Sequence, residues 1–263
     1  MRSQNVDEIL EVAQEAAVEA GSLLAEKQRT DFKISKKGPV NLVTEMDLMA
    51  EQIIVDRIME RFPDHQILAE ERGSEEGTTP IKWVIDPLDG TTNYAHGYRF
   101  FCVSIGVEVE GKMEVGVVYD PICKELFSAV QGRGATLNDS SIQVSKESGL
   151  EDSLLCTGFS YGDDEIAENL KLFNRMMKSS RSVRRDGSAA LDLSYVACGR
   201  FDGFWELSLN PWDVAAGSLI VQEAGGKVTL FDGSPYTIYD RECLATNGKI
   251  HQVVGNGLVL AVG

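Results

Sequence analysis

An apolar segment that ends in two carboxylates places the strongest constraint on how this chain folds. Residues 83 to 97 read WVIDPLDGTTNYAHG, so Asp86 and Asp89 follow closely on a tryptophan and two β-branched residues. Such a run is typical of a buried strand, and the burial of unpaired carboxylates is costly. The proline and the glycine beside the aspartates predict a sharp turn, which can bring both carboxylates and the carbonyl of Leu88 into one space.

Two interpretations of this turn follow from its chemistry. Three hard oxygen donors at the carboxyl end of a strand suit a divalent cation, Mg²⁺ above all. Alternatively, the aspartates cap local N–H groups and the glycine supplies an unusual backbone angle, which is a common use of these residues. The short pattern D-x-x-D-G-T leaves both interpretations open.

Further carboxylates stand at similar junctions elsewhere in the chain. Glu70 and Glu71 follow the apolar run QILA, and Asp213 follows Pro-Trp and opens the apolar segment VAAGSLIVQEA. Each has a simple alternative, because Glu70 and Glu71 can form a solvated turn and Asp213 can be favoured at a helix N-terminus by the helix dipole. All of them lie where an apolar element meets a turn marked by glycine or proline, which favours one shared site over separate coincidences.

The first half of the chain begins with helical spacing and then changes to strands. Residues 6 to 28 predict an amphipathic helix, and Thr44 with Asp47 resembles a capping box that opens a second helix through about Arg61. The apolar residues of this second helix that we expect to face inward are Leu48, Ile53, Ile54 and Ile58. From 66 to 130 the period is that of strands.

The second half alternates helices and strands, and the closing segment GLVLAVG predicts a short strand or a packed tail. We therefore expect an α/β protein with helices flanking two sheets and a soft boundary near residues 140 to 150.

The charge balance limits the partners. The chain has 25 Lys and Arg against 41 Asp and Glu, a net charge of -16, which disfavours nucleic acid and anionic membrane and would repel a phosphorylated substrate unless cations invert the local field. The five cysteines form no C-x-x-C pair, and the start of the chain lacks an apolar signal segment, which predicts reduced thiols in the cytoplasm. No apolar run approaches the roughly 20 residues that span a bilayer.

Two long motifs carry a family resemblance. The segments WVIDPLDGTTNYAHG and WDVAAGSLIVQEAGG stand in this order at residues 83 to 97 and 212 to 226, and GPVNLVTEMD, LAEE and RRDGSAALDLSYVACGRFDGFWEL match as well. With these features the sequence resembles the inositol monophosphatase family of magnesium-dependent, lithium-sensitive phosphatases. The resemblance implies a layered αβαβα sandwich, with residues 1–145 supplying most metal ligands and residues 146–263 supplying Asp213 and substrate contacts.

The resemblance also implies a ligand set for two to three Mg²⁺ ions. Glu70, Asp86 and the Leu88 carbonyl would hold the first ion, and Asp86, Asp89 and Asp213 would hold the second. Glu70 would also meet a third ion through water. Metal ions make buried carboxylates tolerable and reverse the sign of an acidic site.

Catalytic roles follow from the same resemblance. Thr91 with Asp47, and Glu70 on the metal side, would orient the attacking water, although Asp47 can equally serve helix capping alone. The N–H groups of Gly90 and Thr91 would hold the phosphate.

Substrate contacts are implied for a further set of residues. Glu206 would accept hydrogen bonds from sugar or cyclitol hydroxyls, or it is an exposed charge at a strand end. The other implied substrate contacts are Asp89, Gly187, Ser188 and Ala189. Lys36 or Lys37 would close over the site unless they are only solvated, and Arg184 or Arg185 would contact a second phosphate or a dimer partner.

The residues after D-G-T indicate the substrate branch. GTTNY is similar to the inositol phosphatase branch, so we expect hydrolysis of myo-inositol 1-phosphate and related monophosphates. The alternatives are fructose-1,6-bisphosphatase, a broad-specificity sugar phosphatase, and a non-enzymatic role in bacterial transcription complexes by contact with transcription factors. The resemblance further implies a homodimer and inhibition by lithium.

Overall fold

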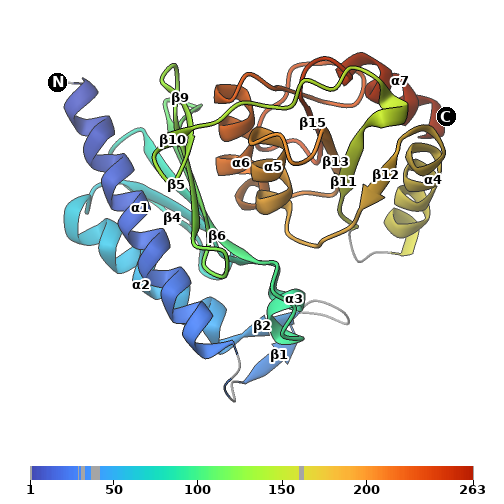
Figure 1. The fold of residues 1–263 in the computed structure, drawn as a ribbon. Coiled ribbons are helices and arrows are strands. Elements are labelled where there is room, and N and C mark those ends of the chain that lie inside the picture. Colours follow the sequence, from blue (N-terminus) through green and yellow to red (C-terminus); the bar gives the residue numbers. More distant parts are fainter. Residues whose placement is uncertain (1, 29, 31–32, 37–41, 160–162, 263) are drawn as a thin grey trace.

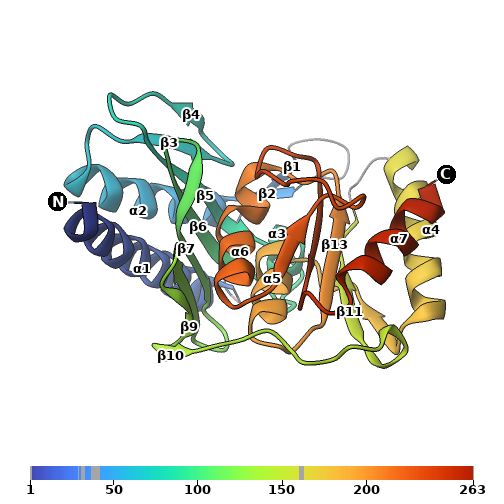
Figure 2. The ribbon, with the colours of Figure 1, turned by 90° about the horizontal axis from the view of Figure 1, so that it is seen from above.

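The computed structural model describes residues 2–28, 30, 33–36, 42–159 and 163–262. Helices and sheets alternate in five layers (Figure 1), and Figure 2 shows the same stack from above. Helices α1 (Arg2–Lys27) and α2 (Glu45–Arg61) form the first layer, and α4 (Asp163–Ser179) and α7 (His251–Val262) form the last. The expected αβαβα sandwich is confirmed.

The second layer is an eight-stranded sheet. In spatial order its strands are β10 (Ser140–Ser141), β9 (Gly134–Leu137), β8 (Glu125–Val130), β7 (Lys112–Asp120), β6 (Cys102–Val109), β5 (Ile81–Asp89), β3 (Gln66–Ala69) and β4 (Gly73–Glu75). Only β3 and β5 pair in parallel in this sheet. The short pair β1 (Ile34–Lys36) and β2 (Leu42–Thr44) forms a separate sheet that leads into α2.

The fourth layer is a five-stranded sheet from the second half of the chain. In spatial order its strands are β12 (Ser182–Arg184), β11 (Leu154–Thr157), β13 (Gly203–Leu207), β15 (Glu242–Thr246) and β14 (Lys227–Thr229). Helices α5 (Ala189–Ala197) and α6 (Pro211–Glu223) lie between the two sheets as the third layer. The remaining short helices are α3 (Thr91–Ala95) and the 3-10 turn Leu150–Asp152.

Three hydrophobic clusters fill the spaces between the layers. The period of two along β5 explains how the strand serves two of them, because Trp83 and Ile85 pack with α1 and α2 while Val84 packs with α5 and α6. The third cluster joins the five-stranded sheet to α4 and α7. Helix α6 approaches the large sheet closely, since a methyl group on Gly116 would lie 2.7 Å from the carbonyl oxygen of Ala216.

Two expectations were wrong. The closing segment is not a strand but the end of helix α7, and it is packed as the second alternative expected: a methyl group on Gly255 would lie 2.8 Å from the oxygen of Phe231, and one on Gly257 would lie 2.5 Å from Met176 Cε. Leu48 is 55% exposed instead of inward, because the first turns of α2 bury Met46, Asp47, Ala50 and Glu51 on the opposite face. Among the described helices, none combines the length and the apolar character needed to cross a membrane.

Candidate functional site

A bulge at the end of β5 places its two aspartates on the same face of the sheet. In a regular strand, residues three apart point to opposite faces. The pairing with β6 shifts between Asp86 and Asp89, around a proline that has no N–H to donate. Asp86 therefore lies on the same face of the sheet as Val84, which packs against α5 and α6. Leu88 lies on the other face, in the cluster with α1 and α2, and Asp89 again points to the first face, where it contacts α5.

Asp89 is fixed from the second half of the chain. Its Oδ2 accepts hydrogen bonds from Ser188 Oγ at 2.7 Å and from the N–H of Ala190 at 2.7 Å, at the start of α5. The Sγ of Cys102 on β6 lies 3.9 Å from the same oxygen. Burial raises the pKa of Asp89 to about 6, although these hydrogen bonds act in the opposite direction.

Asp213 lies in the first turn of α6, as its sequence position predicts. Its Oδ2 accepts hydrogen bonds from the backbone N–H of Asn210 at 2.7 Å and from Asn210 Nδ2 at 3.3 Å, which completes a capping box with Asn210 as N-cap. The expected role at the helix terminus is therefore confirmed. In addition, burial and the charges of Asp89 and Glu70 raise the pKa of Asp213 to about 8.

Glu70 and Asp86 complete the acidic cluster. Glu70 follows β3 directly, and its N–H donates to the oxygen of Ile85 at 3.1 Å, which continues the parallel ladder to β5. Asp86 is 2% exposed, and its Oδ1 accepts a hydrogen bond from the N–H of Leu88 at 3.0 Å. Burial, and then repulsion by Glu70, Asp89 and Asp213, raises the pKa of Asp86 well above its ordinary value.

Asp47 makes the capping contacts that its sequence position predicts and also contacts Thr91. Its Oδ2 accepts hydrogen bonds from the N–H and the hydroxyl of Thr44, at 2.8 Å and 2.6 Å, and so caps α2. Its Oδ1 accepts a hydrogen bond from Thr91 Oγ1 at 2.9 Å. The side chain is fully buried, and burial raises its pKa against the effect of these hydrogen bonds.

One cavity of about 390 Å³ collects most of the predicted site residues. From the predicted set, the residues that line it are Glu70, Asp86, Leu88, Asp89, Gly90, Thr91, Arg185, Gly187, Ser188, Ala189, Glu206 and Asp213. This size falls within the range of small-molecule sites. Residues from both halves of the chain, and from both large sheets, therefore meet at one pocket.

Two predicted residues do not line the cavity, and the side chains of two others fall outside the described part of the chain. Asp47 lies behind Thr91 rather than on the cavity wall, and Arg184 is exposed outside it and donates to Ser182 Oγ at 2.7 Å. Lys36 is the last residue of β1, but its side chain lies outside the described part, as does Lys37 altogether.

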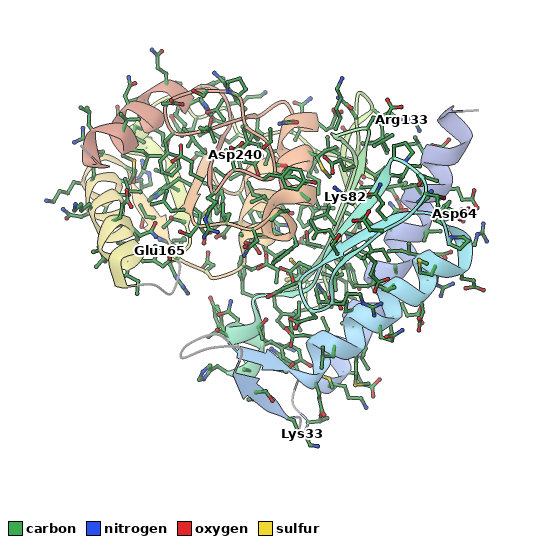
Figure 3. All side chains as sticks on the ribbon, turned by 180° about the vertical axis from the view of Figure 1, so that it is seen from behind. Lys33, Asp64, Lys82, Arg133, Glu165 and Asp240 are labelled. Atoms are coloured by element: carbon green, nitrogen blue, oxygen red, sulfur yellow. The ribbon has the colours of Figure 1, made fainter. Side chains whose placement is uncertain are left out.

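Other cavity residues were not predicted. Asn93 Nδ2 donates to the backbone oxygens of Phe100, Asp186 and Gly187 at 2.7, 2.8 and 3.3 Å, which ties α3 to the 186–187 turn. Because Asn93 lies inside the first long motif, the sequence could have indicated that it belongs to the site. Gly158, Arg241 and Glu165 also line the cavity, and no local pattern in the sequence indicates them; Glu165, in the first turn of α4, is labelled in Figure 3.

The donor chemistry of the cluster fits hard divalent cations. Carboxylates from Glu70, Asp86, Asp89 and Asp213 and the Leu88 carbonyl line the cavity, and every one of these donors is an oxygen. Mutual repulsion among the carboxylates is relieved when a cation is bound, and the raised pKa values of Asp86 and Asp213 reflect burial first and that repulsion second. Within the described part of the chain, the basic side chains that line the cavity are Arg185 and Arg241.

A five-layer α/β fold with a recessed pocket of strongly perturbed carboxylates defines a candidate enzyme. Comparison with known proteins gives the family: the inositol monophosphatase family matches residues 5–259, and the chain belongs to it. This membership supports phosphatase activity, and the family is generally metal-dependent.

Individual relatives agree with this assignment. The chain is 49% identical over 252 residues to an inositol-1-monophosphatase of Synechocystis, covering 95% of this chain and 88% of the relative. It is 43% identical over 246 residues to the Nus factor SuhB of Escherichia coli K12, covering 92% of each. The solved inositol monophosphatase of Anabaena superposes with a TM-score of 0.88 at 44% identity and 97% coverage of both chains.

Proposed function

We propose that this protein is a Mg²⁺-dependent phosphomonoesterase that hydrolyses myo-inositol 1-phosphate and related polyol or sugar monophosphates to the alcohol and phosphate. The observation that carries the proposal is the convergence of Glu70, Asp86, Asp89 and Asp213 on one cavity where burial and mutual repulsion raise carboxyl pKa values. In this proposal residues 1–145 and 146–263 form two halves, and the site lies at the seam between them.

Two to three Mg²⁺ ions would be held by the acidic cluster. Glu70, Asp86 and the Leu88 carbonyl would hold one ion, and Asp86, Asp89 and Asp213 would hold another. When bound, the ions supply charge that attracts the phosphate group, polarise it, and lower the pKa of a coordinated water. They would also neutralise a cluster whose repulsion otherwise destabilises the fold.

Thr91 is arranged to orient a water molecule. Its hydroxyl has one proton, which it donates toward Asp47 Oδ1 at 2.9 Å, with the Leu88 oxygen a second acceptor at 3.1 Å. The oxygen of Thr91 is thereby held as an acceptor toward the cavity, where it can receive a hydrogen bond from water. Asp47 is itself held by Thr44, so the pair is rigid before substrate binds.

The remaining cavity residues would position the substrate. The backbone N–H groups of Gly90 and Thr91 would bind phosphate oxygens, and the left-handed conformation of Gly90, with φ at 101°, lets the chain turn from β5 into α3. The carboxylate of Glu206 would accept hydrogen bonds from substrate hydroxyls. Ser188, whose hydroxyl donates to Asp89 at the start of α5, and the neighbouring Ala189 would line the same side of the substrate.

Two alternatives have an observation in their favour. Arg185 and Arg241 both line the cavity, and their positive charges favour a sugar bisphosphate such as fructose 1,6-bisphosphate. The similarity to Nus factor SuhB favours contact with transcription factors, a role that pull-down with an inactive Asp86→Asn variant would test.

A phosphate-release panel tests the proposal. Purified protein is assayed with Mg²⁺ and with EDTA on inositol, fructose, histidinol and adenosine phosphates. We expect Mg²⁺-dependent release with myo-inositol 1-phosphate among the best substrates by kcat/KM. A tenfold preference for fructose 1,6-bisphosphate would replace the proposed substrate, and release that persists in EDTA would overturn the metal dependence.

A further inference from the structure

The carboxylate of Glu206 lies in the space that a side chain on Gly158 would occupy. Strands β11 and β13 run in parallel with Thr157 opposite Trp205, so the next residue along each strand is Gly158 and Glu206. A methyl group on Gly158 would lie 2.1 Å from both Oε1 and Oε2 of Glu206 and 2.2 Å from its Cδ. Atoms that are not bonded to one another do not approach so closely.

This glycine is required for space and not for backbone conformation. Positive φ angles, which favour glycine, occur at eleven described glycines, and Gly158 is not among them. An alanine at position 158 can therefore adopt the same backbone. Its methyl group would meet the flexible end of a side chain, so the adjustment falls on the carboxylate of Glu206.

The carboxylate has few other restraints. Among the described residues no hydrogen bond to the Glu206 carboxylate is present, and both Glu206 and Gly158 line the cavity. Burial and the charges of Asp213 and Asp89 raise the pKa of Glu206, while Arg185 acts in the opposite direction. The carboxylate thus lies against Gly158 on one side and faces repelling carboxylates across the cavity.

We propose that Gly158 is a positioning residue that sets the place of the Glu206 carboxylate and, through it, the preference for substrates with hydroxyl groups. This inference rests on the proposed function, in which Glu206 accepts hydrogen bonds from a polyol. The three atoms nearest to a methyl group on Gly158 all belong to Glu206, which is neither a proposed metal ligand nor a phosphate contact. Its substitution should therefore change substrate recognition and leave the phosphate chemistry in place.

The test compares Gly158→Ala, Glu206→Ala and the double variant on two substrates. Myo-inositol 1-phosphate carries ring hydroxyls, whereas p-nitrophenyl phosphate has none. We expect Gly158→Ala to raise KM for the inositol ester about tenfold, with kcat within about threefold, since a hydrogen bond to a charged group is lost. KM for p-nitrophenyl phosphate should remain within about twofold.

A double-mutant cycle separates this role from a structural one. If Gly158 acts through Glu206, the methyl group should have little further effect on KM once the carboxylate has been removed by Glu206→Ala. Combining Gly158→Ala with the shorter side chain of Glu206→Asp should bring KM for the inositol ester part of the way back toward the value of the unmodified protein. The matched control is Gly149→Ala, whose methyl group would lie 3.3 Å from the Glu151 carboxylate, away from the cavity. This control should leave both KM values unchanged.

Additive effects of the two single substitutions would overturn the proposal, as would an equal loss on both substrates. A crystal structure of Gly158→Ala gives a readout that needs no activity: the Glu206 carboxylate should be displaced while the backbone of β11 stays in place. An unmoved carboxylate beside a shifted backbone would contradict the inference. If the unmodified protein released no phosphate from either substrate, the proposed function would fail, and this structure would still decide the relation between the two residues.

Discussion

The replacement Asp213→Asn should stabilise the protein in EDTA and lose most of that advantage when Mg²⁺ is added. The unfolded chain ionises this carboxyl near pH 3.8, whereas the pKa in the fold is about 8. Between these values the folded state binds more protons than the unfolded state, so the stability falls as pH rises through the window. At pH 7, where the unfolded chain is ionised and the folded carboxyl is mostly protonated, the loss of stability relative to low pH is at most about 4 kcal/mol when no cation is bound.

Asparagine removes the charge and keeps the shape. Its side-chain oxygen can still accept the hydrogen bond from the N–H of Asn210 that caps α6. In EDTA at pH 7 the variant should therefore be more stable than the unmodified protein, by about 1–4 kcal/mol. With Mg²⁺ at about 100 times its dissociation constant the unmodified protein should gain about 2.7 kcal/mol, and the variant should gain much less.

Urea unfolding at pH 7, with EDTA and with Mg²⁺, measures both quantities. The control is Asp232→Asn, an exposed turn residue whose Oδ1 accepts the N–H of Ser234 at 2.8 Å and which lies outside the cavity; its response to Mg²⁺ should match that of the unmodified protein. The reasoning would be refuted if Asp213→Asn were less stable in EDTA and kept the full gain from Mg²⁺.

Three further predictions concern other parts of the molecule. Asp47→Asn should lower kcat at least tenfold, about 1.4 kcal/mol of barrier, while the stabilisation by Mg²⁺ remains. A smaller loss of kcat in steady-state assays would show that Asp47 and Thr91 do not orient the attacking water. Burial lowers the pKa of His251 from 6.5 to about 4, so the free energy of unfolding should fall by up to about 3 kcal/mol as pH falls from 6.5 to 4. If a His251→Gln variant showed the same dependence of stability on pH in urea unfolding, His251 would not be the cause. Gly116→Ala should destabilise the protein by about 1–3 kcal/mol in urea unfolding, because its methyl group meets the backbone of α6 at Ala216, and an unchanged midpoint would show that α6 can move away.

Local chemistry was sufficient to predict some element ends and the residues that stand there. Thr44 and Asp47 predicted the start of α2, and the capping box is present. The junctions after apolar runs predicted that Glu70, Asp86 and Asp213 share a site, and they line one cavity. Such features can be read from the sequence because caps, strand ends and turns depend on residues that are close in sequence.

Features that depend on distant contacts were not predictable in the same way. The glycines of α7 argue against a helix locally, and close packing against Phe231 and Met176 overrides that tendency. The bulge that returns Asp89 to the face of Asp86 needs the pairing with β6, and the place of Gly158 beside Glu206 needs the pairing of β11 with β13. A sequence pattern along one strand contains neither partner.

The central claim is that the acidic cluster binds divalent cations, and anomalous diffraction from crystals soaked in Mn²⁺ tests it most directly. The account predicts at least two anomalous peaks in the cavity, coordinated by carboxylate oxygens of Glu70, Asp86, Asp89 and Asp213 and by the Leu88 carbonyl. Absence of any peak there, at a Mn²⁺ concentration that supports phosphate release in solution, would contradict it.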